Sequence, residues 1–181
     1  MYLSIHTAVA RIQYIHNGLL SFARTLLLQC AMTFMLLPFS LSAWGVTSIQ
    51  VIGHSAADMP HADKPLLANI FMRRVRVNKQ GKALVPVNLP VDHPLRSIYS
   101  EILFGQQPQA MEQYWNEQYF KGISPPFVVS SMEAVRRFVA GTPGAVGYVI
   151  NCQDDDRADV LLNIPLSAEQ SRKISGLCQA Q

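Results

Sequence analysis

An uncharged stretch near the N-terminus most constrains what this chain can fold into. Residues 25–43 read TLLLQCAMTFMLLPFSLSA, nineteen residues without a charge, and Arg24 precedes them with no acidic residue before it. A basic segment, an apolar run and a cluster of small residues are the parts of a secretory signal. We therefore expect residues 1–43 to be a signal peptide, cleaved after Ala43, and residues 44–181 to form the folded domain.

The alternative is an uncleaved membrane anchor, because a spanning helix needs about 17 to 25 apolar residues and this run is long enough. Pro38 and the small residues Ser40, Ser42 and Ala43 favour cleavage, since they are typical of the end of a signal's apolar region. In the alternative, the leader alone would hold the chain to a membrane.

The charge balance excludes classes of protein that depend on a strong electrostatic field. The whole chain has 15 Lys plus Arg against 12 Asp plus Glu. Removal of the leader takes away Arg11 and Arg24 and no acid, which leaves 13 basic and 12 acidic residues. A nearly neutral domain offers little attraction to nucleic acid or to an anionic membrane, so we expect neither as a partner.

Two cysteines remain after the leader, since Cys30 lies within it. In an oxidising compartment, Cys152 and Cys178 predict a disulfide bond that would add about 3 kcal/mol to the free energy of unfolding. The alternative is two unpaired buried thiols.

The elements of residues 44–181 alternate between short strands and amphipathic helices, a pattern that predicts an α/β fold with a mixed sheet flanked by helices. Strands are expected at 48–53, 145–150 and 160–163, with a hairpin of 73–77 and 84–88 around the turn 78–82. Pro86 removes a ladder donor, which predicts an edge strand or a bulge there. Helices are expected from Asp63 to Phe71, over 94–104, from Pro108 to Gly122, up to Gly141, and from Ser167 onward.

Two helix starts have specific capping predictions. Asp92 is expected as the N-cap of helix 94–104, and Ser130 with Glu133 as a capping box for the helix that ends at Gly141. In the helix that follows Pro108, one apolar face is expected to carry Met111, Tyr114, Trp115 and Tyr119.

The residue patterns indicate no metal site, no cofactor and no enzyme. His54, His61 and His93 lack the spacing of a helical zinc pair. Asp154, Asp155, Asp156 and Asp159 lack the alternate spacing of a calcium loop, so a solvated turn is expected. The serines have no identifiable base or oxyanion partner. Arg73, Arg74, Arg76 and Arg96 are either solvated side chains or donors to an anion.

Several segments in order resemble a known family. They are VIGH (51–54), IFMRRVRVNKQGKALVPVNLPVDHPLRSIYSEILFG (70–105), MEQYWNEQYFKGISPP (111–126) and SSMEAVRRFVAGTPGAVGYV (130–149). Together they resemble short members of the phosphate ABC transporter substrate-binding protein family. The resemblance implies a type 2 periplasmic-binding-protein-like fold, a single lobe, and a periplasmic location. It also implies a binding role, with phosphate or another small oxyanion as ligand and an ABC permease or another periplasmic protein as partner.

The resemblance also implies a place for the ligand. Full-length members carry an Arg followed by Ser-Gly-Thr at a helix N-terminus, whereas the corresponding stretch here runs from Asn88 to Arg96. Pro94 has no N–H, Leu95 has no hydroxyl, and Asp92 would repel an anion. The anion site that is expected to remain has Arg96 as its charge and Ser55, Asn88 and His93 as donors.

Two alternatives to this site stay open. The four residues form a capping and loop network without a ligand, or the chain is a degenerate lobe kept as a periplasmic protein-interaction domain. The second alternative predicts an exposed aromatic patch formed by Tyr114, Trp115, Tyr119 and Phe120.

Overall fold

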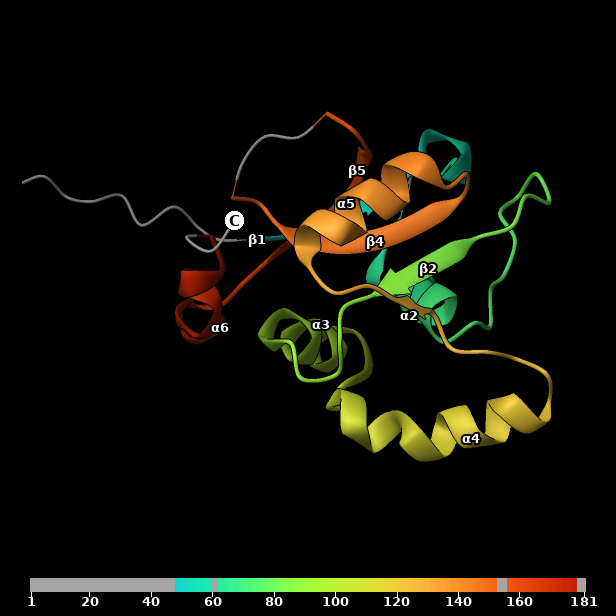
Figure 1. Ribbon diagram of the computed structural model, residues 1–181, viewed down its shortest axis with the longest axis horizontal. Coiled ribbons are helices and arrows are strands. Elements are labelled where there is room, and N and C mark those ends of the chain that lie inside the picture. The colour runs from blue at the N-terminus through green and yellow to red at the C-terminus, as the bar shows by residue number, and fades with distance from the viewer. Residues whose placement is uncertain (1–47, 60–61, 153–155, 179–181) are drawn as a thin grey trace, which may run out of the picture. The chain divides into compact units, whose positions relative to one another are not determined.

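A five-stranded mixed sheet forms the centre of the fold, in the order β3–β2–β4–β1–β5 (Figure 1). Its strands are β1 (Ser48–Gly53), β2 (Val85–Asn88), β3 (Phe127–Val128), β4 (Ala145–Ile150) and β5 (Asp159–Pro165). Strand β2 runs parallel to β3 and β4, and β1 runs antiparallel to β4 and β5. The predicted α/β class with a mixed sheet is confirmed.

The computed structural model describes residues 48–59, 62–152 and 156–178, all of which belong to the unit Gly45–Gln181. The expected signal peptide and its cleavage site, residues 1–43, lie outside the described residues. Among the helices of the described ranges, none combines the length and apolar character needed to cross a membrane.

Strand β4 is buried on both faces, and the two faces meet different helices. A Cβ atom on Gly147 would come within 2.5 Å of Val135, which belongs to α5 (Met132–Gly141). The next side chain, Tyr148, points to the other face, where its ring stacks on Tyr99 with the centroids 3.8 Å apart. Because side chains alternate along a strand, α5 covers one face, and α2 (Lys64–Phe71) and α3 (Pro94–Phe104) cover the other.

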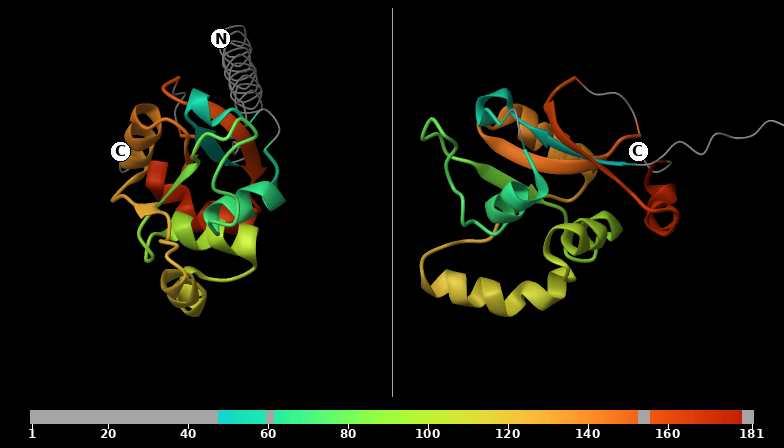
Figure 2. Two further views of the ribbon diagram at one scale, coloured as in Figure 1. Left: turned by 90° about the vertical axis from the view of Figure 1, so that its right-hand side faces the viewer. Right: turned by 180° about the vertical axis from the view of Figure 1, so that it is seen from behind.

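The remaining helices surround this core. An irregular turn, η2 (Pro108–Met111), leads into α4 (Glu112–Phe120), which lies on the far side of α2 and α3 from the sheet in every view (Figure 2). The C-terminal elements are α6 (Ala168–Ile174), which packs on α3, and η3 (Ser175–Cys178). A short turn, η1 (Ser55–Ala57), follows β1.

Most helices start close to where they were predicted, but some of their capping residues differ. Asp63 is the N-cap of α2, and its Oδ1 accepts the N–H of Leu66 at 2.8 Å, as expected. The N-cap of α3 is His93 instead of Asp92, because its Nδ1 accepts the N–H of Leu95 at 3.2 Å.

The N-cap of α5 is Ser131 instead of Ser130, so the predicted capping box is wrong. The shift of one residue frees the Glu133 carboxylate from the cap. That carboxylate instead accepts two hydrogen bonds from Arg157, at 3.0 and 2.9 Å, and one from Arg137 at 2.9 Å.

The predicted hairpin is reduced to one antiparallel bridge between Val77 and Ala83. Strand β2 is also not an edge strand, since β3 pairs with its last two residues. The missing N–H of Pro86 is tolerated for a simple reason. Val85 donates its N–H to the carbonyl oxygen of Gly144, on the β4 side, at 2.9 Å. Successive amides of a strand point to opposite sides, so the missing N–H of Pro86 would face the β3 side. Strand β3 pairs with Val87 and Asn88, so its ladder does not reach Pro86.

The predicted apolar face after Pro108 is only partly buried. Met111 is buried, and Tyr114 and Trp115 are half-buried, but Tyr119 is 70% exposed. The helix itself starts at Glu112, because Pro108 opens a separate 3-10 turn.

A disulfide joins Cys152, which follows β4, to Cys178 in η3, as predicted. The cysteines are 26 residues apart, and closure of such a loop stabilises a domain by about 3 kcal/mol in the chain-entropy model.

Gly144 provides a test of how β2 and β4 meet. Its φ is +77°, and a Cβ atom there would overlap the backbone oxygen of Ala83. We expect Gly144→Ala to lower the free energy of unfolding by more than about 2 kcal/mol, since neither the backbone angle nor the carbonyl can adjust easily. The matched control is Gly141→Ala, where a Cβ atom meets nothing within 4 Å. Equal urea midpoints for the two variants would contradict this account.

Candidate functional site

The N-terminus of α3 brings together three of the four residues predicted to bind an anion. Asn88 is the last residue of β2, and His93 and Arg96 lie at the start of α3, five and eight residues later. The short link from β2 into α3 therefore places a carboxamide, an imidazole and a guanidinium in one region.

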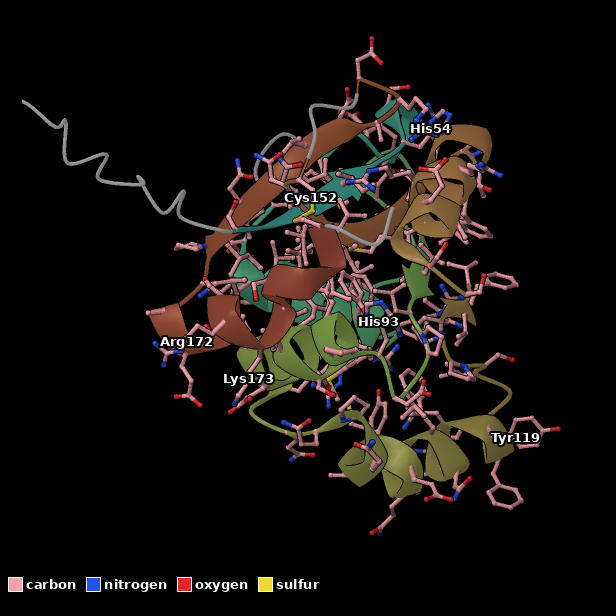
Figure 3. The ribbon with its side chains drawn as sticks, turned by 60° about the vertical axis from the view of Figure 1, so that its left-hand side comes forward. His54, His93, Tyr119, Cys152, Arg172 and Lys173 are labelled. Atoms are coloured by element: carbon pink, nitrogen blue, oxygen red, sulfur yellow. A yellow bond between two sulfur atoms is a disulfide. The ribbon has the colours of Figure 1, made fainter. Side chains whose placement is uncertain are left out.

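Ser55 lies elsewhere. Gly53 pairs with Val146, and Val146 pairs with Pro86, so the chain after β1 emerges at the end of the sheet where β2 begins. Asn88 lies at the end where β2 finishes. Figure 3 shows the same separation, with His54 at one end of the sheet and His93 beside α3. Ser55 is therefore not part of the group around Arg96.

Asn88 combines burial with an unused amide. The residue is only 4% exposed, and its backbone oxygen accepts the N–H of Val129 at 2.9 Å. Among the described residues its side-chain amide has no hydrogen-bond partner, but it is not one of the fully buried unpaired groups, which are the Arg73 Nε and the Tyr99 hydroxyl. The amide therefore reaches solvent and has donor and acceptor capacity for another partner.

Arg96 is fixed by the backbone but keeps donors to spare. Its Nη1 donates to the carbonyl oxygen of Leu89 at 3.3 Å, and its charge opposes part of the rise in the pKa of the nearby Tyr148 hydroxyl. A guanidinium has five N–H donors. The bond to Leu89 therefore holds the side chain in place without using its full donor capacity.

His93 acts as a neutral cap. Burial lowers the pKa of its imidazole, and the charge of Asp92 opposes part of this shift. Because Nδ1 accepts the N–H of Leu95, the ring proton sits on Nε2, which remains a donor. Pro94 has no N–H, so this helix start offers an anion fewer backbone donors than most.

Two stacked tyrosines lie directly beneath the site. Tyr148 accepts the N–H of Leu89 on its hydroxyl at 3.4 Å, and burial raises its pKa to about 12. The hydroxyl of Tyr99 is buried without a partner among the described residues, and burial raises its pKa well above the usual value. Phe71 packs edge-on against both rings, at 5.2 and 5.8 Å between centroids.

Sequence reasoning missed these phenols, because it assigned Tyr99 to an apolar stripe and Tyr148 to a buried strand. The available signal was a tyrosine within a run of aliphatic residues, since a buried phenol normally needs a hydrogen-bond partner.

The three arginines at 73, 74 and 76 have different surroundings, although the charge of Arg76 adds to burial in lowering the pKa of Arg73. Arg73 donates to the carbonyl oxygen of Leu84 at 2.9 Å, with φ at +58°. The guanidinium of Arg74 lies 5.7 Å from the ring centroid of Tyr114, and Arg76 is exposed.

No candidate metal centre emerges from the described ranges, where no three His, Cys, Asp or Glu side chains are grouped to hold an ion. His61, Asp154 and Asp155 lie outside those ranges.

The stacked tyrosines generate a matched pair of substitutions. Tyr99→Phe removes a hydroxyl that is buried without a partner, so we expect the free energy of unfolding to rise by about 1 kcal/mol. Tyr148→Phe takes the acceptor from a buried N–H, so we expect a fall of about 1 kcal/mol. Urea unfolding measures both. A loss of stability in Tyr99→Phe as large as that in Tyr148→Phe would show that the Tyr99 hydroxyl has a partner in solution.

The cap on α3 should make stability depend on pH. The pKa of His93 is lower in the folded than in the unfolded chain, so its contribution is fully present above the ordinary pKa of about 6.5 and is lost as pH falls through the lowered value. We therefore expect the free energy of unfolding to be lower at about pH 5 than at about pH 7.5 because of this group. His93→Asn is the control, because asparagine caps without titrating. Identical pH profiles for the two proteins would refute the assignment.

Comparisons with known proteins show likeness in fold only. No family model matches the chain, and no curated protein matches it. A putative phosphate ABC transporter substrate-binding protein with bound phosphate from Clostridium perfringens superposes with a TM-score of 0.53 at 12% identity, over 74% of this chain and 62% of that one.

Two further structures are less similar. An ABC-type phosphate transport receptor from Vibrio cholerae gives a TM-score of 0.49 at 14% identity, over 73% of this chain and 64% of that one. PstS from Borrelia burgdorferi gives 0.43 at 14% identity, over 59% and 42%. This chain spans less than two thirds of the length of each of these proteins. The first comparison shows that the mixed sheet and its helices share their fold with part of that protein.

Proposed function

We propose that this chain is an exported, solute-binding-protein-like module that binds phosphate or another small oxyanion at the N-terminus of α3. The observation that carries the proposal is the side-chain amide of Asn88, which belongs to a mostly buried residue and has hydrogen-bonding capacity that no described residue uses. Arg96 adds a positive charge with unused donors, and His93 adds an N–H on Nε2.

The electrostatics favour an anion, but only moderately. The N-terminal end of an eleven-residue helix attracts negative charge, and Arg96 adds a full positive charge in its first turn. Asp92 opposes both effects, and Pro94 withholds one backbone donor. We therefore expect weaker binding than a site with a complete set of backbone donors would give.

The fold likeness supports a binding role over catalysis, since the most similar structure described above is that of a substrate-binding protein with bound phosphate. On this proposal residues 1–43 direct the chain to the periplasm, residues 44–181 form the binding domain, and an ABC permease is the partner that receives the ligand.

A second candidate function is a periplasmic protein-interaction domain without a small ligand. It is favoured by four exposed apolar side chains near the end of α4 and on β3, which we call the aromatic patch. The patch consists of Tyr119, Phe120, Phe127 and Val128, which are 70%, 89%, 61% and 62% exposed. Figure 3 shows Tyr119 projecting away from the body of the protein. Of the four residues predicted for such a patch, Tyr119 and Phe120 are exposed, whereas Tyr114 and Trp115 are half-buried, and Phe127 and Val128 were not predicted.

Thermal unfolding with and without phosphate separates the two candidates. A ligand at 100 times its dissociation constant adds about 2.7 kcal/mol to the free energy of unfolding. We expect phosphate in the millimolar range to stabilise the wild-type protein and Arg96→Ala to lose that shift. Chloride at matched ionic strength and the exposed-site variant Arg172→Gln are the controls.

Phosphate also stabilises proteins nonspecifically by exclusion from their surface, so the decisive quantity is the difference between wild type and Arg96→Ala. A shift that persists in Arg96→Ala would place the site elsewhere. No shift in the wild type would favour the interaction domain.

A further inference from the structure

A groove opens at the other end of α3, between the C-terminal ends of α2 and α3 and the start of α4. Its volume is about 470 Å³, within the roughly 300 to 1,000 Å³ typical of small-molecule sites. A second described cavity, beside the 78–80 turn, has only about 210 Å³. Neither is lined by Asn88, His93 or Arg96, so the groove is separate from the proposed oxyanion site.

The groove has an apolar part, which we call its floor. Met72 comes from the end of α2, Leu103 and Phe104 from the end of α3, and Met111 from the end of η2. Phe104 and Leu103 pack partly on the hydrophobic core, and Met111 is buried. Thioether and aromatic side chains adapt well to an apolar ligand, so the floor suits a flexible hydrocarbon body.

The rim has one cation and no anion. Arg74 is the charged residue that lines the groove, and among its described lining residues none is acidic. Asn69 and Gln106 add two carboxamides. No described carboxylate pairs with Arg74, whose guanidinium instead lies 5.7 Å from the ring centroid of Tyr114. A guanidinium can stack on a ring through its face and still donate in its plane to a carboxylate.

Hydrogen bonds hold this wall in place without a ligand. The Tyr114 hydroxyl donates to the carbonyl oxygen of Met72 at 2.7 Å and so ties α4 to the end of α2. The N–H groups of Arg74 and Val75 both donate to the carbonyl oxygen of Asn69, at 2.8 and 3.1 Å. A preformed wall lowers the ordering cost of binding.

From these features we propose that the groove binds a small amphipathic carboxylate, with its apolar body on Met72, Leu103, Phe104 and Met111 and its carboxylate on Arg74. Phosphate fits the chemistry poorly, because it would leave the apolar floor in contact with water. The groove thus adds a second ligand class to the chain, independent of whether α3 binds an oxyanion at its N-terminus.

The test uses sodium octanoate as the probe and 1-octanol as its uncharged match, titrated into the isotopically labelled protein and followed by amide chemical shifts. We expect octanoate to shift the amides of Asn69, Leu103 and Met111. Arg74→Gln should weaken octanoate binding about fivefold while leaving octanol binding unchanged. Arg76→Gln is the matched control, because Arg76 is an exposed neighbour that does not line the groove.

Three results would overturn the proposal: no shifts at the groove with octanoate, shifts centred on the aromatic patch instead, or an equal effect of Arg74→Gln and Arg76→Gln. The amide spectrum of each variant shows directly whether it is folded. Arg74→Gln should keep the phosphate response of the wild type, so a failure here is distinct from a failure at Arg96.

Discussion

The burial of β4 on both faces is the constraint on which the rest of the structure depends. Gly147 lets α5 approach the sheet on one side, and Tyr148 fills the space between the sheet and α3 on the other. A larger residue in place of Gly147 or a smaller one in place of Tyr148 would change the distance between the sheet and the helices that cover that face. The strand therefore sets where α3 lies, and with it the candidate oxyanion site.

The backbone of Leu89 connects this core to the site. Its N–H reaches the hydroxyl of Tyr148, and its carbonyl oxygen accepts from Arg96. A buried core residue and a half-buried cation thus hold the two peptide groups on either side of Leu89. Arg96 has a structural role whether or not an anion is bound, which means that its position is set before any ligand arrives.

Sequence patterns predicted the parts of this fold that local chemistry determines. The strand 145–150, the helix 94–104 and the N-cap Asp63 follow from hydrophobic spacing and from capping, which act over a few residues.

The cap on α3 was assigned to Asp92 because aspartate is the commoner cap, and the competing imidazole becomes visible only in three dimensions. Likewise, β3 has only two residues, and its pairing with β2 is a long-range contact that no local pattern encodes. The separation of Ser55 from Arg96 has the same origin, since strand order decides it.

The bond between Cys152 and Cys178 has a consequence for a chain that is exported as proposed. Before oxidation, the C-terminal helical segment is held by its backbone link to β5 and by noncovalent packing, in which Ile174 is buried. Thiols stay reduced in the cytosol and are oxidised outside it. The disulfide would then form only after translocation. Until it forms, the precursor is easier to unfold and to pass through a channel than the mature protein.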